Sequence, residues 1–376
     1  MHIGIPKETF PGEKRVALIP ASIQKLVKLG AQVSVETGLG ATIGSNDDEY
    51  QKAGAVIAKR EDILRSCDII LRVRKPPLDE ISKLKKSSIH ISFLDPFNET
   101  QLVGELANKN ISAISVEMIP RTTLAQKMDA LSSQANLAGY VTVILAAERC
   151  DKIFPMLMTP AGTITPARVF IIGAGVAGLQ AIATAKRLGA RVEAFDTRPV
   201  VKEQVQSLGA KFVEIDLGET GQTKDGYAKA LTAEQLEKQR QGMAKVCSQS
   251  DIVITTAQLF GRKAPIVLSK EMVAQMKPGS IIVDMAVESG GNVEGSKLNE
   301  EVVTLNGVRI LGMGNLPSRV AVNASQMYSN NLTSLLESYW DKDTKTFKLN
   351  LDDEIIKGCL VTHGGKVVNA QLKKSQ

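Results

Sequence analysis

Three glycines, Gly173, Gly175 and Gly178, carry the clearest chemical signal in this sequence. Their G-x-G-x-x-G spacing, between a strand-like run and a helical one, is typical of a turn that binds the pyrophosphate of a dinucleotide. The first glycine permits the tight turn, the second lets the backbone approach phosphate, and the third lets the helix pack close to the strand. The helix N-terminus adds free N–H groups and a positive dipole end. We therefore predict a phosphate site at this turn, with Ala174 and Val176 between its glycines.

An acid follows at the end of the next predicted strand. Residues 190–195 read as that strand, and Asp196 lies roughly 20 residues beyond the glycines. A carboxylate there would accept a hydrogen bond from an adenine ribose 2′-hydroxyl and repel a 2′-phosphate, which favours NAD over NADP. Arg198 could instead neutralise such a phosphate, so the preference stays open at this point. A packing turn followed by a surface acid is the alternative interpretation.

A second polar group consists of Arg121, Gln126, Asp129 and Ser132. Apolar residues at three- and four-residue steps predict one long helix from Thr122 to about Glu148. The residues of this apolar stripe are Leu124, Met128, Leu131, Ala135, Ala138, Val141 and Leu145. Steps of three place Gln126, Asp129 and Ser132 together on another face. Such a face is ordinarily solvated, but its place between two α/β domains favours ligand binding.

Other common catalytic patterns are missing from the sequence. It has no serine elbow, its three histidines (His2, His90 and His363) are far apart, and its four cysteines (Cys67, Cys150, Cys247 and Cys359) include no C-x-x-C. We therefore expect no metal site and reduced, structural thiols. Oxidation of an alcohol or amine needs a positioned proton acceptor. Hydride exchange between two nicotinamides needs only two rings held close in a dry site.

Length and composition set the class of protein. The 376 residues suggest about two domains. A 43% hydrophobic and 23% charged composition is ordinary for a globular protein, and we see no signal peptide or apolar run of the ~18 residues that a membrane helix needs. Aromatic residues make up 4% and do not alternate with basic ones, so we expect no nucleic acid and no direct membrane insertion. The net charge of +6 includes a cluster at Lys83, Lys85 and Lys86, which is either a solvated face or a contact for an anionic surface.

Alternating strand and helix patterns predict an α/β protein with two doubly wound, Rossmann-like domains joined by long helices. The first domain comprises residues 1–134 and 321–376, and a helix over 320–340 returns the chain to it. The second domain, 135–320, carries the dinucleotide turn. Its strands are expected near 168–172, 191–196, 211–215, 251–257, 281–286 and 308–313. Residues 154–166 are expected as an extended excursion, and the polar insertion 216–229 as either a lid or a surface loop.

Three stretches together resemble one family. They are Ile5-Pro6-Lys7-Glu8 with 15–18, the run 121–140, and the fingerprint 173–198. They resemble the alanine dehydrogenase/nicotinamide nucleotide transhydrogenase superfamily. Within it, essentially the whole chain resembles the NAD(H)-binding component of the proton-translocating transhydrogenases. The most specific stretches are 128–140 and 225–228.

Two departures separate the branches of this family. Alanine dehydrogenases use a lysine where this chain has Arg74, and a histidine where it has Asp95; Lys75 lies one place out of register. These departures favour the transhydrogenase branch. An alanine dehydrogenase-like oxidoreductase and a non-catalytic NAD(H)-binding module are the alternatives.

The resemblance implies that NAD(H) binds here and exchanges hydride directly with NADP(H) on a partner subunit, coupled to proton movement through membrane-spanning subunits. The catalytic residues it implies are Arg121, Gln126, Asp129 and Tyr227. The cofactor-binding residues it implies are Ser132, Gly173, Ala174, Gly175, Val176, Gly178, Asp196, Thr197, Arg198, Gly226, Gln239, Ala257 and Gln258. A leucine is expected at the position of Gln258. The resemblance also implies a cytoplasmic homodimer, active only with its partners and peripheral on the cytoplasmic face of the inner membrane.

Overall fold

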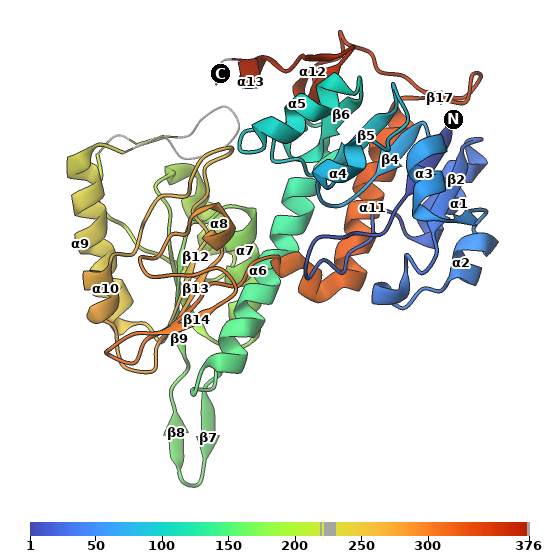
Figure 1. The fold of residues 1–376 in the computed structure, drawn as a ribbon. Coiled ribbons are helices and arrows are strands. Elements are labelled where there is room, and N and C mark those ends of the chain that lie inside the picture. The colour runs from blue at the N-terminus through green and yellow to red at the C-terminus, as the bar shows by residue number, and fades with distance from the viewer. Residues whose placement is uncertain (219, 222–230, 374–376) are drawn as a thin grey trace. The chain divides into compact units, whose positions relative to one another are not determined.

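The computed structural model describes residues 1–218, 220–221 and 231–373. The chain divides into two compact units, Met1–Gln134 with Ser318–Gln376 (unit 1) and Ala135–Pro317 (unit 2). Each unit contains its own mainly parallel sheet (Figure 1). The predicted α/β class with two doubly wound domains is confirmed.

The sheet of unit 1 has the strand reversal of a doubly wound fold. Its strands, in order across the sheet, are β19 (Lys366–Val367), β18 (Leu360–His363), β6 (Ser112–Ser115), β5 (Ile89–Ser92), β4 (Ile69–Leu71), β1 (His2–Ile5), β2 (Gln32–Glu36) and β3 (Val56–Ala58). β1 to β6 are parallel, and the order reverses between β1 and β4. β18 adds to β6 in the antiparallel direction. The helices are α1 (Pro20–Lys28), α2 (Asp47–Lys52), α3 (Arg60–Ser66), α4 (Leu78–Ile81), α5 (Thr100–Asn108), α11 (Ala321–Ser338), α12 (Glu354–Cys359) and α13 (Ala370–Lys373).

The sheet of unit 2 repeats this topology. Its strands, in order, are β11 (Lys211–Phe212), β10 (Arg191–Phe195), β9 (Arg168–Ile172), β12 (Ile252–Thr255), β13 (Ile281–Asp284), β15 (Arg309–Leu311) and β14 (Glu301–Val303). All are parallel except β14, and the order reverses between β9 and β12. The helices between them are α7 (Val176–Arg187), α8 (Lys202–Ser207), α9 (Ala233–Gln249) and α10 (Lys270–Ala274).

Helices cover both faces of the unit 2 sheet, so its central strands are apolar at almost every position. On β9, Val169 and Ile171 belong to one core cluster, which includes residues of α7 and α8. Phe170 and Ile172 belong to a second cluster, with residues of α9 and α10. This alternation follows from the two-residue period of a strand. The two cores fix the carboxyl ends of β9, β10, β12 and β13 along one edge of the sheet.

The long helix α6 (Ala130–Arg149) begins later than the periodicity predicts. The expected start at Thr122 is wrong, because the Asp129 side chain caps the helix by accepting a hydrogen bond from the Ser132 N–H at 2.8 Å. Residues Gln126–Met128 form a separate 3₁₀ turn, η3. Leu124, expected in the buried stripe, is 83% exposed.

Helix α6 is also the one helix in the described part of the chain that is long and apolar enough to cross a membrane. Half of its apolar window is buried inside the structure. Val143 and Ala146 pack in the core of unit 2. Core packing therefore accounts for the apolar character of α6, as it does for central helices of many globular proteins.

The excursion before β9 is a β-hairpin, formed by β7 (Leu157–Thr159) and β8 (Gly162–Ile164). Every residue of both strands is exposed. Figure 1 shows the hairpin projecting from unit 2, beyond the end of its sheet. Its exposed apolar side chains are Met156, Leu157, Met158 and Ile164.

Candidate functional site

The glycine turn of unit 2 joins β9 directly to α7, and its glycines have the backbone conformation and close approach that the motif predicts. Gly173 has a φ of +97°, which favours glycine. A Cβ on Gly178 would lie 1.9 Å from the carbonyl oxygen of Gly173, so helix and turn approach each other as only glycine allows. Thr256, just beyond β12, donates its hydroxyl to the Gly173 carbonyl at 3.0 Å. The turn is therefore also held from the neighbouring strand.

The N-terminus of α7 is open to an anion. Gly175 is the N-cap and offers no side-chain hydrogen bond to the first turn. The space beside Gly175 is open, since the nearest atom to a Cβ placed there would be Arg198 Nη2, at 3.9 Å. The N–H groups of Gly175 and Val176 have no partner among the described residues. Backbone donors at the positive end of a twelve-residue helix fit a pyrophosphate.

Asp196 lies where β10 ends and connects that strand to the turn. Its Oδ2 accepts a hydrogen bond from the Ala174 N–H at 2.7 Å, so this amide is already used inside the protein. Arg198 contacts both carboxylate oxygens, through Nε at 2.9 Å and Nη2 at 2.7 Å. The Arg198 N–H also donates to Oδ1. Hydrogen bonding to Asp196 raises the pKa of the Arg198 guanidinium. The predicted ribose contact of Asp196 stays a prediction.

The segment after β12, which includes Ala257, is held by a buried pair that the sequence analysis did not identify. Asn292 accepts a hydrogen bond from the Ala257 N–H at 3.0 Å and donates to the Ala257 carbonyl at 2.8 Å. Asp284, at the end of β13, accepts in turn from the Asn292 N–H at 2.9 Å. Both side chains are fully buried. An acid at the end of an apolar strand, as in residues 281–284, was the signal that could have found this pair.

The remaining described residues of the predicted cofactor site have different surroundings. Gln239, on α9, is buried, and its amide oxygen has no partner among the described residues. A buried unpaired amide oxygen costs roughly 1–3 kcal/mol, so it fits a site that a ligand completes. Gln258 is exposed. The carbonyl of Thr197 accepts from the Thr220 hydroxyl at 2.6 Å. Gly226 and Tyr227 lie outside the described residues.

In unit 1, the polar residues around the start of α6 do not share one helical face, so that prediction is wrong. Gln126 is exposed on η3, Asp129 is the cap, and only Ser132 is inside the helix. The cap nevertheless brings three of the four together: Ser132 donates its hydroxyl to Asp129 Oδ2 at 2.6 Å, and Arg121 Nε lies 4.0 Å from the same oxygen.

Asn331 of α11, missed by the sequence analysis, holds the polar segment of unit 1 in place. Its amide nitrogen donates to the Lys127 carbonyl at 2.8 Å, and its amide oxygen accepts from the Ser133 hydroxyl at 2.7 Å. The side chain therefore connects η3 to the first turn of α6. Both contacts lie within unit 1.

The two positions that distinguish the branches are also in unit 1. Arg74 pairs with the buried Glu13 side chain at 3.1 Å and stacks on the Phe10 ring at 4.6 Å. A guanidinium stays protonated at any working pH, so Arg74 cannot accept a proton from a substrate. The neighbouring Lys75 pairs with Glu99. Asp95 is exposed, and desolvation raises the pKa of its carboxyl.

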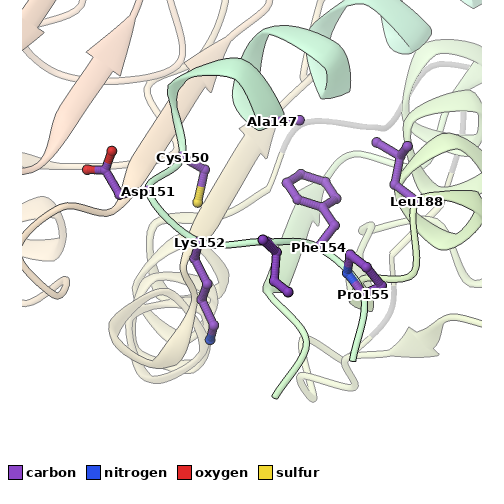
Figure 2. Close-up of a pocket in the computed structure, with 8 residues that line it drawn as sticks. Ala147, Cys150, Asp151, Lys152, Phe154, Pro155 and Leu188 are labelled. Carbon is purple, nitrogen blue, oxygen red and sulfur yellow. The ribbon is translucent and has the colours of Figure 1, made fainter. Parts of the chain in front are cut away.

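The hollow shown in Figure 2 belongs to a different part of unit 2. It has a volume of about 500 Å³ and is lined by Ala147, Cys150, Asp151, Lys152, Ile153, Phe154, Pro155 and Leu188. These residues end or follow α6, or follow α7, at the amino ends of the parallel strands. Dinucleotides bind at the carboxyl ends, so this hollow is not the predicted nucleotide site. Within the described residues, no cluster of His, Cys, Asp and Glu could hold a metal ion.

Comparison with known proteins places this geometry in a family. The pattern described as Alanine dehydrogenase/PNT, N-terminal domain, matches residues 4–138, and the corresponding C-terminal domain matches residues 142–370. The chain is 45% identical to the first of the separately encoded parts of NAD(P) transhydrogenase subunit alpha from Rhodospirillum rubrum, over 99% of both chains. It is 44% identical to a transhydrogenase crystal structure from Sinorhizobium meliloti, covering 98% of this chain and 100% of that one, with a TM-score of 0.88.

The other branch is more distant. Alanine dehydrogenase of Methanococcus maripaludis is 27% identical, over 100% of this chain and 96% of that one. The lower identity agrees with the presence of Arg74 and Asp95 where the resemblance places a lysine and a histidine in alanine dehydrogenases. The chain belongs to the alanine dehydrogenase/PNT family, on the branch of the NAD(P) transhydrogenase alpha subunits.

Proposed function

We propose that this chain binds NAD(H) at the carboxyl edge of the unit 2 sheet and exchanges hydride with NADP(H) held by a partner subunit. The observation that carries the proposal is the open α7 N-terminus, placed between Asp196 and the end of β12. The unpaired Gln239 oxygen on α9 supports it. The nicotinamide of the bound cofactor supplies the hydride; the residues of this chain bind it, orient it and exclude water.

The chain's residues divide this work by chemistry. The Gly175 and Val176 N–H groups would hold the pyrophosphate, and Asp196 the adenine ribose. In unit 1, Arg121, Asp129 and Ser132 form a connected polar group that would orient the nicotinamide carboxamide together with Gln126. Tyr227 is proposed to close over the nucleotide. Direct exchange between two nicotinamides takes no proton from a substrate, which agrees with Arg74 at a position where a base would act.

The complex with other subunits also belongs to this proposal. Relatives whose names describe one portion of an alpha subunit imply further subunits, and we propose an NADP-binding beta subunit and membrane-spanning subunits that couple hydride transfer to proton translocation. The chain would then lie at the cytoplasmic face of the inner membrane. The exposed apolar side chains of the β7–β8 hairpin support a homodimer, because a monomer would leave them in water.

The decisive experiment follows hydride transfer with and without the partner. The purified chain should bind NADH, measured by calorimetry, and should not reduce an NADP⁺ analogue until the NADP-binding partner is added. Oxidation of alanine with NAD⁺ by the chain alone would contradict the proposal and favour the dehydrogenase alternative. Binding of NADH without transfer in the reconstituted complex would favour the non-catalytic module.

The homodimer is tested by the mass in solution. Met158→Glu places a charge on the hairpin, where the side chain is 78% exposed, and should shift the sedimentation coefficient from dimer toward monomer. Val56→Glu in unit 1, at a side chain that is 63% exposed, is the matched control and should leave the mass unchanged. A wild-type chain that sediments as a monomer at all concentrations would refute the homodimer.

A further inference from the structure

The strongest feature left unexplained by the proposed function is the ion pair of Asp196 and Arg198. Four donors converge on this one carboxylate: the Ala174 N–H, the Arg198 N–H, and Nε and Nη2 of the Arg198 fork. A carboxylate has about four lone-pair sites, so these donors occupy the full capacity of Asp196. The side chains are 6% exposed for Asp196 and 14% exposed for Arg198.

The pair lies against the glycine turn rather than on open surface. One end of the Asp196 carboxylate is tied to Ala174, and Nη2 of Arg198 is the nearest atom to the open side of Gly175. A group that meets the Asp196 carboxylate from the nucleotide side is therefore within a few ångströms of the Arg198 guanidinium. Within this chain the two charges cancel, and the arginine is a bidentate partner, not an available cation.

This arrangement resolves the ambiguity that the sequence left at Arg198. We propose that Arg198 is a specificity-determining residue whose positive charge is masked by Asp196, so that the site rejects a 2′-phosphate only while this ion pair is intact. The inference rests on the proposed nucleotide site. It adds that Asp196 acts twice: its carboxylate repels a 2′-phosphate directly, and it keeps the nearby Arg198 guanidinium from attracting it.

The masked arginine predicts an unusually simple conversion of specificity. Removing the charge of Asp196 releases a preplaced arginine, which supplies the bidentate phosphate recognition that an NADP site requires. Asp196→Asn keeps the side-chain shape and an acceptor for the Ala174 N–H. It should weaken NADH binding about tenfold or more, by loss of a charged hydrogen bond, and strengthen NADPH binding about tenfold.

Three further variants identify the source of the gain. In Asp196→Asn/Arg198→Gln, the improved NADPH binding should disappear. In Asp196→Asn/Arg191→Gln it should persist, because Arg191 is an exposed arginine at the opposite end of β10. Arg198→Gln alone leaves the Asp196 charge in place, so NADPH binding should stay within about twofold of the wild-type value.

Calorimetry with NADH, NADPH and the fragment 2′,5′-ADP measures these effects, and circular dichroism checks that each variant is folded. If Asp196→Asn does not fold, Asp196→Thr, which also retains an acceptor, takes its place. If neither variant folds, Arg198→Gln decides: a large loss of the residual wild-type NADPH binding would show that the arginine is not masked, and an unchanged value supports the inference. Folded charge-removing variants with no gain in NADPH binding would overturn it. A wild-type chain that does not bind NADH would instead refute the proposed function.

Discussion

The two units have the same order of parallel strands, yet only unit 2 leaves the donors of its first connection open to a ligand. In unit 2, three residues separate β9 from α7, and the helix begins at an uncapped glycine. In unit 1, the connection from β1 to α1 is longer, and α1 begins after Ile19 with a proline in its first turn. The topology is shared, so the difference lies in these connections.

Unit 1 fills the same edge with its own carboxylates. Glu8 accepts hydrogen bonds from the N–H groups of Val73 and Arg74, just beyond β4. Glu117 accepts from the Leu94 N–H, just beyond β5. The backbone donors at these strand ends are therefore satisfied by the protein, whereas in unit 2 the donors of the α7 N-terminus remain available. A doubly wound sheet becomes a dinucleotide site only when its first connection leaves such donors open.

The largest effect should come from removing a carboxylate of unit 1. The Glu13 side chain is fully buried and pairs with the buried Arg15 at 2.7 Å. Desolvation would raise the pKa of Glu13, but the hydrogen bonds and charge of Arg15 outweigh it and hold the pKa at about 2. Glu13→Ala leaves a buried guanidinium without its main partner, which should lower the free energy of unfolding by about 3–5 kcal/mol. Chemical denaturation measures this loss. NADH affinity per folded molecule should stay unchanged; a large loss of affinity would mean that the unit 1 edge takes part in nucleotide binding.

The next effect is the pH dependence of the same edge. Desolvation raises the pKa of Glu8 to about 7 from its ordinary value of 4.5. Between these two values the unfolded chain releases a proton that the folded chain keeps, so the contribution of Glu8 to stability falls as pH rises from about 4.5 to about 7 and is constant above that. The expected change is roughly 3 kcal/mol. Glu8→Gln should remove this part of the pH profile; identical profiles for both proteins would contradict the assignment.

A smaller but more selective effect is expected in the unit 2 turn. Gly178→Ala forces a Cβ against the Gly173 carbonyl and should cost about 1–3 kcal/mol of stability, with a large loss of NADH affinity because the turn must open. The control is Gly104→Ala, on α5 of unit 1, where a Cβ would meet nothing within 4 Å. That change should stabilise the protein by about 0.5–1 kcal/mol and leave NADH binding as it is. Similar effects at the two glycines would remove the distinction between the two edges.

The sequence was sufficient for the features that depend on local patterns. The strands of unit 2, the glycine turn and the position of Asp196 all follow from spacing along the chain. The start of α6 did not, because apolar periodicity continues through η3, and only the capping bond of Asp129 ends that turn. The supports of the site were also missed, since Asn292 and Asn331 act on segments 35 and 204 residues away in the chain. The masking of Arg198 required atomic contacts.

The most direct test of the contrast between the two edges is hydrogen–deuterium exchange with and without NADH. We predict that NADH slows exchange at residues 173–178 and 196–198 of unit 2. Exchange at residues 6–19 and 73–74 of unit 1 should not change, because their edge is filled by Glu8 and Glu13. Protection of residues 6–19 and 73–74, with none at the glycine turn, would contradict this contrast.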